Sequence, residues 1–273
     1  MKNIYFVFLF LSSVIILSCD KVDEPYTSAV PAKDWYGKRI LLEDYTGHTC
    51  INCPAAAAVA ANIKTLYGDK VIIISVHADY FAKPVLPEFP EDFRTTAGEI
   101  WYKFFGFLGN PYGMINRKGF TNSTQILGPG AWAAKVGSIM TELPEVEISV
   151  APIYDSTTKT LTGNVKTKFL KTIRKKLKLQ IVLTEDSIVA PQKDGNITVP
   201  NYIHRHMMRG AINGSWGSVL TDGLNNTPIE TELSQNILFT FDSSWKSKHC
   251  TVVAFVYDAD TYEILQVAEK HLE

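Results

Sequence analysis

The sequence has few cysteines, little net charge and no apolar run of comfortable membrane-spanning length. Four cysteines in 273 residues exclude a small scaffold held together by many disulfides. The formal net charge of -1 gives no reason to expect nucleic acid or a strongly acidic partner. With 46% apolar and 20% charged residues, the composition is typical of a globular chain and not of a disordered one. The length allows one large domain or two ordinary ones.

The first residues have the pattern of a secretory signal. Lys2 supplies a short positive segment, and residues 4–17 are almost all apolar. This run is short for a membrane span and is typical of a signal peptide. It ends in Ile-Leu-Ser before Cys19, which resembles a bacterial lipobox. The resemblance implies that residues 1–18 are removed and that Cys19 is lipidated. An ordinary cleavable signal beside an incidental cysteine is the alternative.

A polar tether follows, over residues 19–33. It begins with an acidic cluster that includes Asp20, Asp23 and Glu24, which resembles the surface-export signals of Bacteroidetes lipoproteins; a solvated linker is the alternative. We therefore expect a cell-envelope lipoprotein held at the outer membrane by acyl chains and not by a spanning helix. Both the periplasmic face and the cell surface remain open.

A Cys-x-x-Cys pair is the strongest chemical signal in the chain. Residues 39–42 predict a strand, Cys50 and Cys53 follow it, and the alanine-rich run from Pro54 to Ala61 predicts a helix. A strand that leads into such a pair at the start of a helix is typical of a thioredoxin-like redox site. A helix N-terminus lowers the pKa of a thiol placed there, because its unpaired N–H groups carry partial positive charge.

The next strand completes a β-α-β unit. Residues 71–76 form a continuous β-branched run, which favours a central strand covered on both faces. Residues 55–67 have apolar positions at helical spacing and end at Gly68, which predicts the connecting helix. This arrangement puts the cysteines beyond the carboxyl ends of parallel strands, where open α/β sheets bind ligands.

A second signal is the segment from Gly109 to Gly119, which contains Asn110-Pro111, then a short strand and a turn. It resembles the cis-proline loop of the thioredoxin fold, and residues 130–143 predict a following helix. The resemblance covers residues 38–143 and implies a thioredoxin-like α/β domain at 34–145. It also implies that Pro111 lies beside the dithiol and that the backbone of Asn110 docks the substrate.

Two further side chains are candidates for the chemistry. Asp44 occupies the place of the buried acid of thioredoxins, where it would accept the proton of Cys53; an exposed aspartate at the strand end is the alternative. His48, if protonated, would stabilise the Cys50 thiolate, or it points to solvent. The pair between the cysteines is Ile51-Asn52 and not Gly-Pro, so the direction of redox chemistry stays open.

The segment between the second strand and the proline loop is rich in aromatic residues. Residues 91–105 predict a helix whose apolar positions include Phe93, Trp101, Phe104 and Phe105. We expect this cluster mainly to fill a core. As an insertion, the segment could also form one wall of a cleft above the cysteines.

In residues 146–273 apolar and polar residues alternate with a period of two, which predicts half-buried strands. We expect an antiparallel β-sandwich there, immunoglobulin-like in broad form. Its expected strands lie within 146–150, 161–169, 176–183, 237–241, 251–257 and 263–268. His204 and His206 lack partners at ligand spacing, so we expect residues 201–210 to be a loop or short strand packed on the first domain. We expect Cys250 to be a buried, unreactive thiol.

Together the lipobox, the cysteine motif, the Asn110-Pro111 loop, residues 202–209 and Trp216-Gly217 resemble the Omp-28-related lipoproteins of Bacteroidetes. That resemblance implies a thioredoxin-like domain, a β-sandwich and an outer-membrane location.

Three functions compete. The first is thiol–disulfide exchange on exported proteins or peptides by Cys50 and Cys53, with Asp44, His48, Asn110 and Pro111 in the roles given above. The second is a surface binding or adhesion lipoprotein in which Cys50–Cys53 is a static disulfide. The third is copper or other metal handling by the two cysteines with His48 or His77. We expect no cofactor, no resident metal and no nucleic-acid partner.

Overall fold

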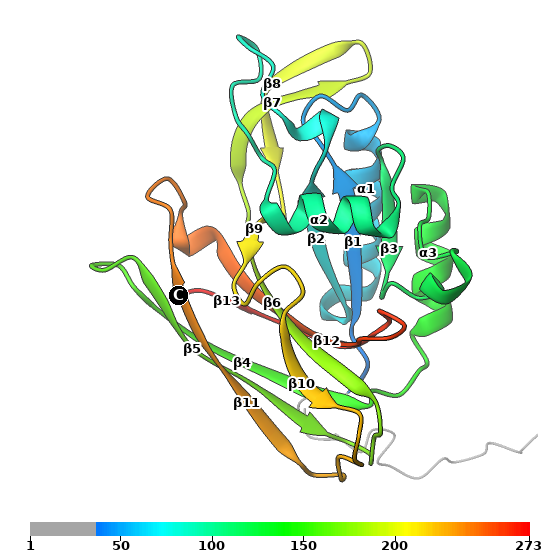
Figure 1. Ribbon diagram of the computed structural model, residues 1–273. Helices are drawn as coiled ribbons and strands as arrows, with labels where there is room; N and C mark the ends of the chain where they lie inside the picture. Colours follow the sequence, from blue (N-terminus) through cyan, green and yellow to red (C-terminus); the bar gives the residue numbers. More distant parts are fainter. Residues whose placement is uncertain (1–36) are drawn as a thin grey trace, which may run out of the picture. The chain divides into compact units, whose positions relative to one another are not determined.

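A mixed sheet of eight strands runs through the part of the chain that the structure describes, residues 37–273 (Figure 1). The structure is a computed structural model, in which the described residues form one compact unit. The strand order is β13-β12-β6-β9-β2-β1-β3, and β10 pairs with β6. Two smaller sheets, β11-β5-β4 and β7-β8, accompany it. The fold is therefore mixed α/β and rich in strands, which agrees with the expected class at this level.

The strands are β1 (Ile40–Thr46), β2 (Val71–His77), β3 (Tyr112–Ile115), β4 (Val146–Asp155), β5 (Thr160–Phe169), β6 (Lys176–Glu185), β7 (Ile188–Asp194), β8 (Ile197–His204), β9 (Met207–Ala211), β10 (Ser218–Asp222), β11 (Glu232–Thr240), β12 (Cys250–Asp258) and β13 (Ile264–His271). The helices are α1 (Cys53–Tyr67), α2 (Thr96–Phe105) and α3 (Pro129–Ile139), with short 3-10 turns at Gly68–Lys70, Tyr80–Ala82, Phe120–Asn122 and Ser247–His249.

The predicted β-α-β unit is present. β1 and β2 are parallel, in register from Ile40 opposite Val71 to Thr46 opposite His77. Every residue of both strands is buried, as a continuous β-branched run predicts for a strand covered on both faces. α1 and α3 pack on one face, and α2 packs on the other. β3 runs antiparallel to β1, with Tyr112 opposite Tyr45.

Two helices are shorter than the sequence pattern predicts. α2 begins at Thr96 and not near residue 91, because the Thr95 hydroxyl accepts a hydrogen bond from the Gly98 N–H and caps the helix there. α3 ends at Ile139 and not at Leu143. Leu143 precedes Pro144, and a proline disfavours helical backbone angles at the residue before it.

Five strands after residue 146, β6, β9, β10, β12 and β13, belong to the same sheet as β1, β2 and β3. β9 lies between β2 and β6. It pairs in parallel with β2, where Met207 lies beside Ser75, and it pairs antiparallel with β6. Residues 201–210 thus contribute a short strand that packs on the first half of the chain, as expected. The boundary predicted at 145/146 falls between α3 and β4, and one sheet crosses it.

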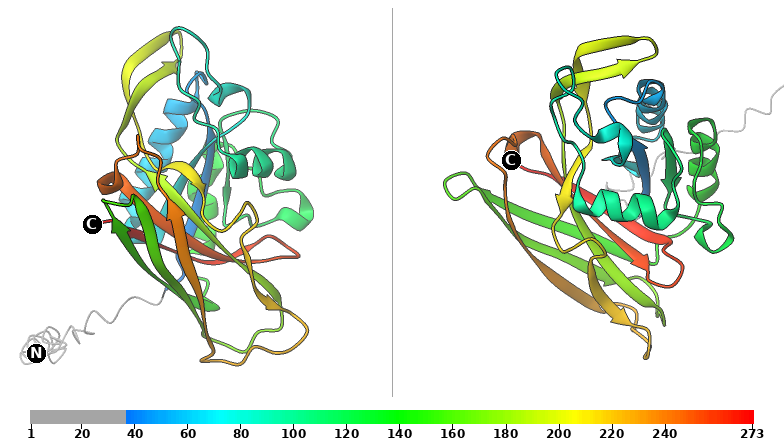
Figure 2. Two further views of the ribbon diagram at one scale, coloured as in Figure 1. Left: turned by 60° about the vertical axis from the view of Figure 1, so that its left-hand side comes forward. Right: turned by 45° about the horizontal axis from the view of Figure 1, so that its top comes forward.

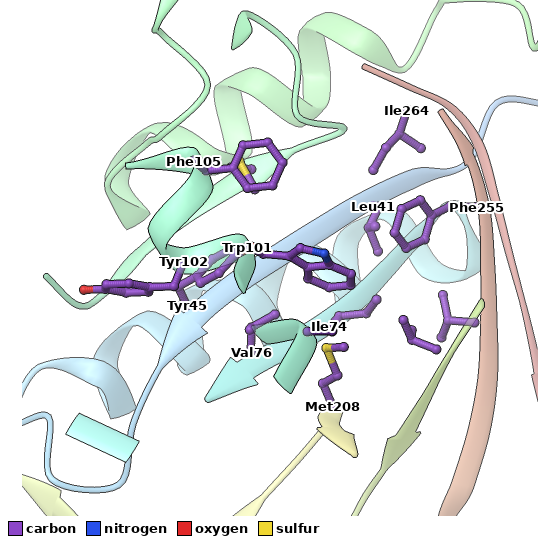
Figure 3. Packing of buried hydrophobic residues seen from close by; sticks show 14 of the residues in the cluster. Leu41, Tyr45, Ile74, Val76, Trp101, Tyr102, Phe105, Met208, Phe255 and Ile264 are labelled. Carbon is purple, nitrogen blue, oxygen red and sulfur yellow. The ribbon is translucent and has the colours of Figure 1, made fainter. Parts of the chain in front are cut away.

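The expected antiparallel pairing of the later strands is present. β4, β5 and β11 form their own sheet, which packs against β6, β12 and β13 of the large sheet around a shared core. The other face of β12 packs against α2. Figure 3 shows Trp101 and Phe105 of α2 in the same cluster as Leu41 of β1 and Phe255 of β12.

A buried ion pair lies in the cluster that β1, α2 and β12 share. The Arg117 Nε and Nη2 atoms donate to the two carboxylate oxygens of Glu43 at 2.8 and 2.7 Å. The guanidinium carbon also lies 5.0 Å from the Trp101 ring centroid and 5.1 Å from that of Phe255. The pair therefore ties β1 to the layer that carries α2 and β12.

Candidate functional site

The two cysteines of the motif form a disulfide at the end of β1. Cys50 and Cys53 are bonded, with Cα atoms 5.4 Å apart, and each is only 2% exposed. α1 begins at Cys53, with Pro54 in its first turn, where a missing N–H costs nothing. The cysteines therefore lie where the positive end of the helix dipole would stabilise a thiolate.

The loop between β1 and α1, residues 47–52, is the cysteine loop, and the segment that follows β2 holds it on one side. The Thr49 N–H donates to the Phe81 carbonyl oxygen at 3.1 Å, and His48 Nε2 donates to the Lys83 carbonyl oxygen at 2.9 Å. A Cβ atom at Gly47 would overlap the backbone of Phe81. Only glycine allows this close approach.

On the other side, the β7–β8 hairpin binds the same loop. The Lys193 N–H donates to the His48 carbonyl oxygen at 2.8 Å, and the Gly195 N–H donates to the Ile51 carbonyl oxygen at 2.9 Å. Gln192 Nε2 is 3.1 Å from the Cys50 carbonyl oxygen and 3.3 Å from that of Gly47. Figure 2 shows the hairpin at the end of the molecule where α1 begins. Contributions from both halves of the chain thus cover the disulfide.

Asp44 is buried, and is not the exposed strand-end residue of the alternative interpretation. It is 2% exposed, and its Oδ1 has no hydrogen-bond partner. Burial raises the pKa of this carboxyl to about 7. Asp44 lines a small cavity of about 30 Å³, together with Cys53, His77 and His204. A group that changes charge near neutral pH therefore lies in the same cavity as Cys53.

Three buried histidines surround Phe93 next to the disulfide. Its ring centroid lies 5.2 Å from that of His48, 5.4 Å from His77 and 5.3 Å from His204. Burial lowers the pKa of all three imidazoles, that of His204 to about 4. They are therefore uncharged at neutral pH.

His48 thus differs from both of its expected states. It does not point to solvent, and an uncharged ring does not stabilise a thiolate through its charge. The cause is packing against Phe89 and Phe93 of the segment after β2.

The proline loop lies at the same end of the sheet. The Asn110–Pro111 peptide bond is cis, and Tyr112 just after it pairs with Tyr45, shortly before the cysteine loop. Both polar side-chain atoms of Asn110 are buried without a hydrogen-bond partner. The backbone thus brings Asn110 and Pro111 to the end of β1 from which the cysteines follow.

Other candidates are not part of this cluster. Cys250 is buried, burial raises the pKa of its thiol to about 12, and its sulfur lies 3.4 Å from the Lys246 carbonyl oxygen, as expected of an unreactive thiol. His206 lies beside Asp186, with 3.5 Å between Nδ1 and the carboxylate. Within residues 37–273, no three His, Cys, Asp or Glu side chains are placed to hold a metal ion.

The sequence did not indicate that residues of β7 and of the end of β8 reach the cysteines. Gln192, Tyr202, His204 and Arg205 line the small cavity beside Cys53 and Asp44. The Asp194-Gly195 pair is a hairpin-turn signal that could have revealed these two strands. Nothing in their pattern shows that they lie on the cysteine loop.

Comparison with known proteins identifies the family and similar folds. Residues 99–273, more than half of the chain, match the family model described as outer membrane protein Omp28; the matched range begins after Cys50 and Cys53. The fold is similar to HBP35 of Porphyromonas gingivalis, with a TM-score of 0.67 and 18% identity over 87% of this chain and 76% of that chain. At that identity the likeness shows the fold alone.

A crystal structure of a domain of the outer membrane lipoprotein Omp28 from Porphyromonas gingivalis is 24% identical, over 48% of this chain and 91% of that chain, with a TM-score of 0.33. No curated protein matches the chain at a significant level. Within residues 37–273, no helix is long and apolar enough to span a membrane. The chain belongs to the outer membrane protein Omp28 family, which confirms the expected outer-membrane location.

Proposed function

We propose that this lipoprotein is a thiol–disulfide oxidoreductase of the cell envelope, anchored through lipidated Cys19 and acting on exported proteins through Cys50 and Cys53. The order β1-α1-β2 with antiparallel β3, the cysteines at the start of α1 and the Asn110-Pro111 loop at the end of β1 support a thioredoxin-like assignment for this part of the chain. The later β-strands would then be its fused β-sandwich.

The state of Asp44 carries the proposal. A static disulfide needs no carboxyl group beside it, and burying one whose pKa rises to about 7 costs stability at neutral pH. Its Oδ1 has no protein partner, and it lines the same cavity as Cys53. Perturbed carboxyl groups of this kind cluster at functional sites.

The chemistry would proceed in two balanced steps. In the reduced protein, the Cys50 thiolate attacks one sulfur of a substrate disulfide, forming a mixed disulfide and releasing the other substrate sulfur as a thiolate. Cys53 then gives its proton to the Asp44 carboxylate and attacks Cys50. The mixed disulfide breaks, the Cys50–Cys53 bond forms, and the second substrate thiolate leaves. Two electrons pass from the protein dithiol to the substrate, and the reverse sequence oxidises a substrate dithiol.

A static disulfide in a surface binding protein is the second candidate. One observation favours it: both cysteines are 2% exposed, under a hairpin that bonds to the cysteine loop. The oxidoreductase therefore requires the hairpin to move away from the loop before a substrate sulfur reaches Cys50.

Reduction of insulin disulfides by the full-length protein in detergent, with dithiothreitol as electron donor, separates the two candidates. We expect acceleration by the wild type and by Cys250→Ser, which keeps the motif. The Cys50→Ser/Cys53→Ser variant should show none, and Asp44→Asn should be slower. A wild-type rate equal to that of the double variant, with the free dithiol confirmed by thiol titration, would refute the oxidoreductase.

A further inference from the structure

A groove of about 450 Å³ lies between α1 and β8, beside the disulfide. One wall is formed by small side chains of α1, among them Ala57, Ala58 and Ala61. The other wall includes Tyr202 and Ile203 of β8. Pockets of this volume with mainly apolar walls are typical binding sites.

The groove leads to the redox site. Asp44 lines both the groove and the small cavity that contains Cys53. Pro54, Ser75 and Arg205 are also shared between the two. Asp44 is 2% exposed and its Oδ1 has no partner. A buried polar atom without a partner points to a ligand that would supply one.

The β8 wall offers an unpaired strand edge. Within residues 37–273, β8 pairs with β7 and with no other strand. Asn201, Tyr202 and Ile203 all line the groove, although consecutive side chains of a strand point to opposite faces. The groove therefore follows the edge of β8 and not one face. Pro200 within β8 agrees with an edge position, because proline lacks the N–H that a central strand needs.

The charges at the groove favour an acidic ligand. Arg205 lines it, and Asp44, the one acidic side chain among the described lining residues, is buried. Arg205 is exposed and forms no ion pair with any of residues 37–273. A carboxylate on the ligand would therefore find an unpaired guanidinium at the rim.

We propose that this groove binds an extended, apolar peptide segment with an acidic residue, which adds to the free edge of β8 as a further strand. Its apolar side chains pack against the alanines of α1, and its carboxylate pairs with Arg205. Strand addition of this kind takes affinity from the main chain and specificity from side-chain pockets. The inference rests on the proposed function in one respect: the bound segment would be the part of an exported protein that delivers its cysteine to the disulfide.

Binding of a fluorescent peptide to the full-length protein tests the groove. The probe has about six alternating valine and threonine residues followed by one glutamate, and anisotropy is read with the Cys50→Ser/Cys53→Ser variant, so that no covalent bond contributes. Ala61→Trp, which fills the groove, should weaken binding at least about tenfold. Ala55→Trp is the matched control, because Ala55 is exposed on the same helix but does not line the groove; it should bind as before.

Arg205→Ala should weaken binding of the glutamate peptide about fivefold and leave a glutamine version unchanged. Absence of binding, or equal loss in both tryptophan variants, would overturn the proposal. Groove-dependent binding without insulin reduction would support the site while refuting the oxidoreductase. Insulin reduction that Ala61→Trp leaves unchanged would support the oxidoreductase and overturn this substrate site.

Discussion

Gln192→Ala should expose the disulfide. The Gln192 amide nitrogen lies 2.8 Å from the Lys193 carbonyl oxygen, 3.1 Å from that of Cys50 and 3.3 Å from that of Gly47. Because this nitrogen has two hydrogens, it fastens β7 to the cysteine loop through one or two hydrogen bonds. A typical hydrogen bond contributes about 1 kcal/mol net, so their loss should lower the free energy of opening the hairpin by about 1–2 kcal/mol. This change corresponds to a roughly 5- to 30-fold larger open population.

The assay is the rate at which a small dithiol reduces Cys50–Cys53 under native conditions, followed by alkylation and mass measurement. We expect a rate about 5- to 30-fold higher in Gln192→Ala. Gln235→Ala is the control, because the Gln235 amide bonds only to the exposed backbone of its own strand. An unchanged rate in a folded Gln192→Ala protein would show that the hairpin does not limit access to the disulfide.

Three further predictions concern the buried charges, and urea denaturation measures each. Glu43→Gln leaves Arg117 buried without its carboxylate and should lower the free energy of unfolding by about 3–5 kcal/mol. The control Glu230→Gln, which removes an exposed ion pair, should lower it by less than about 1 kcal/mol. For Asp44, the folded pKa of about 7 exceeds the unfolded value, so wild-type stability falls as the pH rises from about 4 to about 7. Asp44→Asn should therefore stabilise by up to about 4 kcal/mol at pH 8 and by little at pH 4; an equal effect at both would contradict this. For His204 the folded pKa of about 4 lies below the usual 6.5, so wild-type stability falls with acidification from pH 6.5 to 4. His204→Phe should show a smaller loss over that range, and an unaltered loss would contradict the burial of a neutral ring.

Local patterns were enough to predict the β-α-β unit. Residues 71–76 form a β-branched run that favours a strand covered on both faces, and residues 55–67 have apolar positions at helical spacing, so β1, α1 and β2 follow from neighbours in the sequence. β9 could not be placed in the same way. It is short, and its pairing with β2 joins Ser75 to Met207, a contact between distant segments that no periodicity records.

The same limit applies to the site. Cys50, Cys53 and Asp44 belong to one local motif, so their proximity was predictable. Gln192 reaches Cys50 across 142 positions, and His204 comes from the end of β8. The state of His48 was also not predictable, because Phe93 and the backbone of Lys83 bury it, and its own neighbours in the sequence do not indicate this.

The reduction potential of Cys50–Cys53 tests the proposed exchange chemistry most directly. The full-length protein would be equilibrated with dithiol buffers of graded potential, quenched with acid and alkylated, and the oxidised fraction would be measured by mass spectrometry. We predict a value between roughly -270 and -120 mV, the range of known oxidoreductases. A value well below about -300 mV would identify a structural disulfide and refute the proposed exchange chemistry.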